Sequence, residues 1–235
     1  MKKKLFEGSL FTVGASLWWG IIGVIYFKFV SFASPVELTI HRTIWTTVLL
    51  VFTTFYFGKW SEFKKVSKSL NTLGLLFLTG VLVSINWFTW LYAVSTNNLL
   101  DGSLGYYIFP LVAVAFGAIF LGERLSLSQW FAISLAVIAV ILLSFGVGEF
   151  PYIAISLAIT FGLYGLIKKP LTIGPMRSVF WEVVFLLPLA LIWLVGTHFF
   201  GWQGIVSRDG GFFGSDIKVS IALMFTGILT GVPLI

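Results

Sequence analysis

The feature that most constrains this chain is a succession of apolar stretches, each long enough to cross a membrane. A bilayer core requires about 20 mostly apolar residues per helix. The chain supplies such stretches at Gly8–Val30, Glu37–Gly58, Leu73–Ser95, Ser103–Leu121, Ser128–Phe145, Phe150–Ile167 and Val179–Phe200, and another begins near Val219. A water-soluble globule is excluded, because 58% of the residues are hydrophobic and only 10% are charged, too few to cover a soluble surface.

The same stretches predict an all-α polytopic membrane protein. Transmembrane β-barrels require alternation of apolar and polar residues over about 10 residues, whereas these stretches are continuously apolar. We therefore expect about eight transmembrane helices, each of them a single apolar stretch.

Charged residues in the gaps between these stretches predict the topology. The gaps Met1–Lys4, Lys59–Lys68 and Lys168–Arg177 are basic, whereas Thr96–Asp101 and Gly146–Glu149 are acidic. Under the positive-inside rule this alternation predicts a multi-pass protein of the cell membrane with a cytoplasmic amino terminus. The net charge of +6 thus reflects topology, and we expect the lipid bilayer rather than nucleic acid as the partner of these basic residues.

Several classes of chemistry are disfavoured by the residues present. The chain has no Cys, which excludes disulfides and thiolate metal sites, and it has no ATP-binding P-loop. No cofactor or metal is therefore expected. An intramembrane enzyme would have to use His41 with a nearby Ser, or Asp101 with Glu37, and neither spacing has a recognisable catalytic form. We predict that the protein is not an enzyme.

Three pairs of similar segments, in the same order, predict an internal repeat. The pairs are Trp18–Gly23 with Thr160–Gly165, Pro35 with Pro175, and Leu78–Leu82 with Phe225–Leu229. An odd number of spans separates equivalent segments, so the second copy would be inverted in the membrane. Inverted repeats are typical of secondary transporters, whose substrate sites lie near the bilayer midplane.

The repeat divides the chain into two predicted parts. Residues 1–146 would form the first five-helix repeat, and residues 147–235 would form an incomplete second repeat of about three helices. The second copy reaches Ile235 within its third helix. We therefore expect either a fragment of a longer protein or an incomplete carrier.

Polar residues inside apolar spans are costly in lipid and are the first candidates for a site. On the second span Glu37, His41 and Trp45 share one helical face, with Arg42 about a hundred degrees away. This cluster either binds substrate, with His41 able to change charge near neutral pH, or holds helices together through a Glu37–Arg42 or Glu37–His41 pair. The repeat also aligns Arg42 with Glu182, which suggests an ion pair between them.

The remaining candidates lie on the third and fourth spans: Asn86, Trp90, Asp101, Tyr106 and Tyr107. Asn86 and Trp90 share one face, and Asn86 lies close to the middle of its span. An amide beside indole rings could hydrogen-bond and stack a planar substrate. The alternative is that Asn86 forms hydrogen bonds between helices, as Asn often does in membrane bundles. Pro110 predicts a kink in the fourth span.

Several segments together resemble a known family. They are Trp19–Gly20, Tyr26–Lys28, Glu37–Trp45, Asn86–Trp87, Ser103–Leu111, Phe120–Arg124, Phe161–Lys169 and Val232–Leu234. In them the chain is similar to the RarD branch of the EamA-type drug/metabolite transporters over nearly its whole length. The run with Glu37, His41, Arg42 and Trp45 and the segment that begins at Ser103 are the specific matches, whereas Gly-Glu-Arg at the end of a span is common across the superfamily.

The resemblance implies an inner-membrane carrier of about ten helices, built from two inverted five-helix repeats. It implies transport of small organic metabolites or drugs by alternating access, and the chloramphenicol-sensitivity label of RarD-type proteins does not identify a substrate. Arg42 would then meet a substrate carboxylate, and Glu37, His41 or Asp101 would carry a coupling proton. A membrane receptor, a scaffold or an inactive fragment is the alternative, and solute flux would separate transport from these. A homodimer is also left open.

Overall fold

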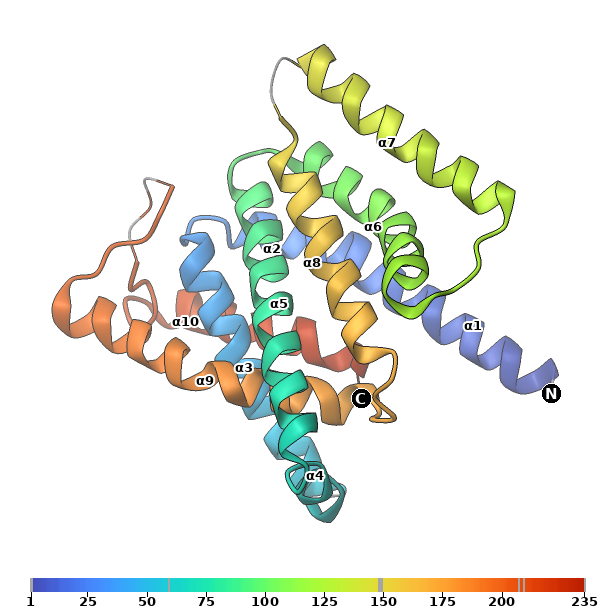
Figure 1. The fold of residues 1–235 in the computed structure, drawn as a ribbon. Helices are drawn as coiled ribbons and strands as arrows, with labels where there is room; N and C mark the ends of the chain where they lie inside the picture. The colour runs from blue at the N-terminus through green and yellow to red at the C-terminus, as the bar shows by residue number, and fades with distance from the viewer. Residues whose placement is uncertain (1, 59, 148–149, 207, 209, 235) are drawn as a thin grey trace. The chain divides into compact units, whose positions relative to one another are not determined.

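The computed structural model describes residues 2–58, 60–147, 150–206, 208 and 210–234, and within them every regular element is helical (Figure 1). The elements are α1 (Lys2–Leu17), the π-helical turn η1 (Trp18–Gly23), α2 (Val24–Phe29), α3 (Pro35–Tyr56), α4 (Trp60–Val66), α5 (Leu70–Ser95), α6 (Leu99–Leu121), α7 (Leu127–Val147), α8 (Tyr152–Lys168), α9 (Pro175–Phe200), α10 (Ile217–Gly231) and the 3₁₀ turn η2 (Val232–Leu234).

The predicted spans coincide with these helices. Six helical segments of the described chain are long and apolar enough to cross a membrane: Gly8–Phe29, Pro35–Tyr56, Leu70–Ser95, Leu99–Leu121, Pro175–Phe200 and Ile217–Leu234. Two shorter apolar helices, Leu127–Leu142 and Tyr152–Lys168, match the fifth and sixth predicted spans. The prediction of an all-α polytopic membrane protein is confirmed.

The helices form two compact units. The first, here called unit 1, comprises Met1–Lys68 and Gly174–Ile235, and the second, unit 2, comprises Ser69–Ile173. Each unit combines helices from both sides of the predicted repeat boundary at residue 146. Unit 1 joins α1, α2 and α3 with α9 and α10, and unit 2 joins α5, α6 and α7 with α8. The inverted repeat itself stays a prediction.

Helix α3 is the centre of unit 1, where α9 and α10 both pack against it. Ser34 caps its start by accepting the N–H of Glu37 at 3.2 Å, and Pro35 occupies the first helical position. The buried hydroxyls of Thr39 and Thr43 each donate to the carbonyl oxygen four residues earlier, at 2.8 and 2.9 Å. These hydroxyls are therefore satisfied within the helix and can be packed without a further partner.

Helix α10 crosses α3 at close range through two glycines. Gly227 and Gly231 are one small-xxx-small spacing apart, which lets membrane helices approach closely. A Cβ at Gly227 would collide with the main chain of Trp45, and one at Gly231 would lie 2.6 Å from Cδ2 of Leu49. The Thr46 hydroxyl donates to the carbonyl oxygen of Gly227 at 3.4 Å. This crossing fixes the part of α3 that carries Trp45.

Helix α4 lies in the basic gap and docks on the start of α9. The Phe63 ring is buried and meets the Phe180 ring edge to face, with centroids 4.8 Å apart. The indole N–H of Trp181 donates to the carbonyl oxygen of Phe63 at 3.3 Å, and Arg177 lies 3.6 Å from Glu62. Trp181, near the start of α9, thus helps to hold α4 in place.

In unit 2, helix α8 packs against both α5 and α6, whereas α7 makes only sparse contacts, with α6. Figure 1 shows α7 standing apart from the three packed helices of this unit. A Cβ at Gly105 would lie 2.8 Å from the carbonyl oxygen of Ala154 and from Cβ of Leu157. One at Gly102 would lie 2.9 Å from the Trp90 ring. Small residues on α6 therefore allow the close approach of α5 and α8 that forms the core of this unit.

Candidate functional site

The predicted face of α3 carries two buried side chains, Glu37 and His41, and the half-buried Trp45, and some of their polar atoms have no partner among the described residues. Glu37 and His41 are 0% and 1% exposed, and Nε2 of His41 lies 3.8 Å from Oε1 of Glu37, as their spacing predicts. Within the part of the chain that the structure describes, Oε2 of Glu37, both ring nitrogens of His41 and Nε1 of Trp45 have no hydrogen-bond partner. An unpaired buried polar atom costs about 1–3 kcal/mol, so this face is poorly suited to a purely structural role.

A loop residue, Phe213, covers this face. Its ring centroid lies 4.8 Å from that of His41 and 6.1 Å from that of Trp45. Its backbone N–H donates to Oε1 of Glu37 at 3.3 Å. Sequence reasoning missed Phe213, because a residue in a gap between spans gives no indication of the helix that it contacts. The aromatic pair Phe212–Phe213, set among glycines, is the signal that could have drawn attention to it.

The segment around Phe213 is held by a glycine turn and by two helices. Gly211 and Gly214 have φ angles of +84° and +89°, a region that favours glycine. The Nε2 of His198, on α9, lies 2.8 Å from the carbonyl oxygen of Phe213 and donates to it. The Phe212 ring meets Phe32 edge to face, with centroids 5.5 Å apart. The Gly214 N–H donates to the Ser220 hydroxyl on α10 at 2.9 Å, so α9 and α10 both hold this segment beside α3.

Arg42 lies beside this face, buried at 7% exposure, with its Cζ 5.3 Å from the centroid of the Phe27 ring. This cation–π contact turns the guanidinium toward α2. Glu182 on α9 is fully buried and accepts a hydrogen bond from the Ser178 hydroxyl at 3.0 Å. Both charged residues belong to unit 1, and a pair between Arg42 and Glu182 stays a prediction.

In unit 2, Asn86 is 1% exposed and both of its polar side-chain atoms are engaged. Its Nδ2 donates to the carbonyl oxygen of Leu157 and to the hydroxyl of Thr160, each at 3.1 Å, and its Oδ1 accepts from the Tyr106 hydroxyl at 2.9 Å. The Trp90 ring packs edge to face on Tyr106, with centroids 5.4 Å apart. These contacts join α5, α6 and α8. They are the contacts expected under the alternative prediction, in which Asn86 forms hydrogen bonds between helices.

The other two candidates of unit 2 lie outside this cluster. Tyr107 is 81% exposed, because it lies about a hundred degrees around α6 from Tyr106. Asp101 lies in the first turn of α6 and is partly exposed. Pro110 lies within α6, which continues to Leu121. A substrate-binding role for the candidates of unit 2 stays a prediction.

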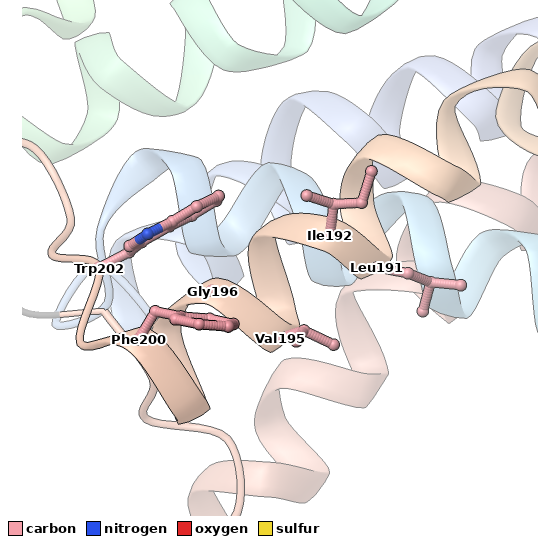
Figure 2. Close-up of a pocket in the computed structure, with 6 residues that line it drawn as sticks. All are labelled: Leu191, Ile192, Val195, Gly196, Phe200 and Trp202. Atoms are coloured by element: carbon pink, nitrogen blue, oxygen red, sulfur yellow. The ribbon is translucent and has the colours of Figure 1, made fainter.

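A pocket of about 300 Å³ lies elsewhere in unit 1, along the last turns of α9 (Figure 2). It is lined by Leu191, Ile192, Val195, Gly196, Phe200 and Trp202. Figure 2 shows the rings of Phe200 and Trp202 on either side of Gly196. Selective binding needs a few convergent polar groups, and this lining is almost wholly apolar, so the α3 face is the better candidate. Nor do the described residues gather three or more His, Asp or Glu into a group that could hold a metal ion.

Known proteins resemble this chain over most of its length. Residues 6–145 match the model of the EamA-like transporter family. An uncharacterized transporter of Vibrio cholerae is 40% identical over 232 residues, which cover 97% of this chain and 73% of that protein. Protein RarD of Salmonella typhimurium is 34% identical and Protein RarD of Escherichia coli is 32% identical, each over 99% of this chain and 76% of the relative. No solved structure matches.

Proposed function

The chain belongs to the EamA-like transporter family, and on that basis we propose that it is a secondary carrier that moves small organic molecules by alternating access. It is a multi-pass membrane protein whose relatives are named as transporters. The observation that carries the proposal is the buried face of α3. Glu37, His41 and Trp45 there present a carboxylate, an imidazole and an indole N–H, each with an atom that has no hydrogen-bond partner in the described part of the chain.

These three side chains suit a small solute that has both a polar group and an aromatic or apolar part. Buried ionisable residues in membrane spans commonly mark substrate or proton pathways, because lipid makes them costly to keep otherwise. The carboxylate and the imidazole would pair with polar groups of the solute, and the indole would pack its apolar part. Transport would then require Phe213 to move away from the α3 face so that the solute can bind there.

The test of this proposal is flux in proteoliposomes that contain the full chain. We expect saturable counterflow of at least one solute from a panel of small aromatic and polar metabolites. Glu37→Gln should lower this flux at least about tenfold, because one charge-assisted contact is worth roughly 1.5–3 kcal/mol. Glu123→Gln, a matched change at a carboxylate of unit 2 that pairs with Lys169, should leave it unchanged. Binding without flux would instead indicate a receptor, and absence of both would contradict the proposal.

Proton coupling is a separate part of the proposal, with Glu37, His41 or Asp101 as the proton carrier. In this case a pH gradient across the vesicle membrane should drive accumulation of the solute. Collapse of the gradient by a protonophore should abolish that accumulation. If accumulation is unchanged after the gradient collapses, then the proposal of proton coupling is wrong, whereas the proposal that the protein is a carrier stands.

We also propose that the protein lies in the cell membrane with its amino terminus in the cytoplasm. The chain has no Cys, so a single introduced thiol reports the side of the membrane without further changes. A membrane-impermeant thiol reagent added to intact cells should label Ser215→Cys and should not label Ser61→Cys. The reverse pattern would contradict the proposed orientation.

A further inference from the structure

Phe213 lies on the α3 face as a bound ligand would. Its backbone N–H donates to Glu37 at 3.3 Å, and its ring lies 4.8 Å from His41 and 6.1 Å from Trp45, centroid to centroid. Its carbonyl oxygen accepts from His198 at 2.8 Å. The atoms between the nitrogen and the ring are Cα and Cβ, so the part of Phe213 that covers α3 has the skeleton of 2-phenylethylamine.

The nitrogen end of this skeleton meets the buried carboxylate of Glu37, whose Oε1 accepts the N–H of Phe213 at 3.3 Å. A primary ammonium group presents three N–H donors to such a carboxylate. The Oε2 atom of Glu37 still has no partner in the described chain, so the carboxylate can accept a further donor. An ammonium group would add the opposite charge, which the loop lacks.

The ring end of the skeleton lies against two aromatic side chains with unpaired polar atoms. The ring planes of Phe213 and His41 are inclined by 33°, and those of Phe213 and Trp45 by 44°. Tilted aromatic contacts of this kind stabilise a ring beyond the area that they bury. Both nitrogens of His41 and Nε1 of Trp45 lack partners within the described residues. A hydroxyl group on an incoming ring would therefore find donors and an acceptor there.

The segment that carries Phe213 has a glycine on each side of its two phenylalanines. Gly211 and Gly214 bracket the two phenylalanines, and both have positive φ angles. Phe213 itself is only half-buried, as is Trp45, whereas Glu37 and His41 are fully buried. Glycines allow the backbone dihedral changes that a hinge requires.

We propose that Phe213 is an internal plug in the substrate site of α3, and that this site takes arylethylamines, in which an aromatic ring is two carbons away from an ammonium group. This inference rests on the proposed transport function, because it names the substrate class of the same site. The ammonium group would replace the Phe213 N–H at Glu37, and the ring would replace that of Phe213 beside His41 and Trp45.

The test is calorimetric binding to the purified full chain with three probes. These are 2-phenylethylamine, 3-phenylpropionate, which reverses the charge, and butylamine, which lacks the ring. Only 2-phenylethylamine should bind. Phe213→Ala should tighten its binding about tenfold, because the competing ring is gone, and Glu37→Gln should weaken it at least about tenfold. Glu123→Gln should leave the affinity unchanged.

Other outcomes would overturn the inference. These are equal binding of 3-phenylpropionate, an unchanged affinity in Glu37→Gln, or no gain in Phe213→Ala. If Glu37→Gln does not fold, Trp45→Leu provides the second variant, in which the preference for 2-phenylethylamine over butylamine should fall. A different result would separate the two proposals. If 2-phenylethylamine does not bind, but another solute is transported and Glu37→Gln lowers that flux, then the arylethylamine inference is wrong and the carrier proposal stands. If the probes bind in the expected pattern but no solute is transported, then the proposed binding site stands and the proposed transport function is wrong.

Discussion

The two compact units each bury a polar cluster inside apolar helices, and the two clusters are built in opposite ways. In unit 2 both polar atoms of the Asn86 side chain are hydrogen-bonded to neighbouring helices. In unit 1, Glu37, His41 and Trp45 lie beneath a loop and have polar atoms with no hydrogen-bond partner among the described residues. If the α3 face binds solute as proposed, the comparison separates two roles for a polar residue in an apolar span. A residue whose hydrogen bonds are completed by the protein packs helices, and one whose hydrogen bonds are not completed binds.

The energetics explain why both arrangements exist. An interhelical hydrogen bond in a membrane protein contributes about 0.6 kcal/mol on average, so the Asn86 cluster stabilises its unit modestly. Unpaired buried polar atoms cost stability, and such sites usually persist where function requires them. The same substitution should therefore have opposite effects in the two units.

The largest effect on stability is expected for Asn86→Leu. This change removes three hydrogen bonds and leaves the Tyr106 hydroxyl without its acceptor. We expect the free energy of unfolding to fall by about 1–3 kcal/mol, measured by denaturation in mixed micelles. Flux per folded molecule should not change. Ile85→Ala, at an exposed position of the same helix, is the control and should cost little. A loss of flux without a loss of stability would instead support Asn86 as a substrate ligand.

The matching change in unit 1, His41→Leu, should act in the other direction. It removes two ring nitrogens that have no partner in the described chain and nearly preserves the side-chain volume. We expect the free energy of unfolding to stay the same or to rise by up to about 1 kcal/mol, while flux falls at least about tenfold. The same denaturation and vesicle assays measure both quantities. Strong destabilisation with normal flux would mean that His41 is structural after all.

A smaller effect is expected for Tyr106→Phe, which removes one of the three hydrogen bonds of Asn86. Loss of about 0.6 kcal/mol in the free energy of unfolding is the expected result. Combined with Asn86→Leu, the change should add almost nothing, since the bond that it removes is already lost. Full additivity in this double-mutant cycle would contradict the hydrogen-bonded cluster.

Helix periodicity was sufficient to predict what lies along one helix. The apolar spans follow from composition, and the adjacency of Glu37 and His41 follows from their spacing, because both depend on a single helix. The partners of these residues could not be predicted in the same way. Phe213 and Thr160 come from distant segments, and their positions depend on how separate helices and loops pack. Helix α4 was not anticipated, since it is too short and too polar to resemble a span.

The most direct measurement compares thiol reactivity at the two clusters. Because the chain has no Cys, His41→Cys and Asn86→Cys each introduce the only thiol. If Phe213 covers a binding face on α3, a water-soluble maleimide should label the thiol at position 41, and Phe213→Ala should speed that labelling severalfold. The thiol at position 86 should stay unlabelled in either background. Equal labelling at the two positions would contradict a covered binding site on α3. So would a labelling rate at position 41 that is the same with Phe213 and with Phe213→Ala.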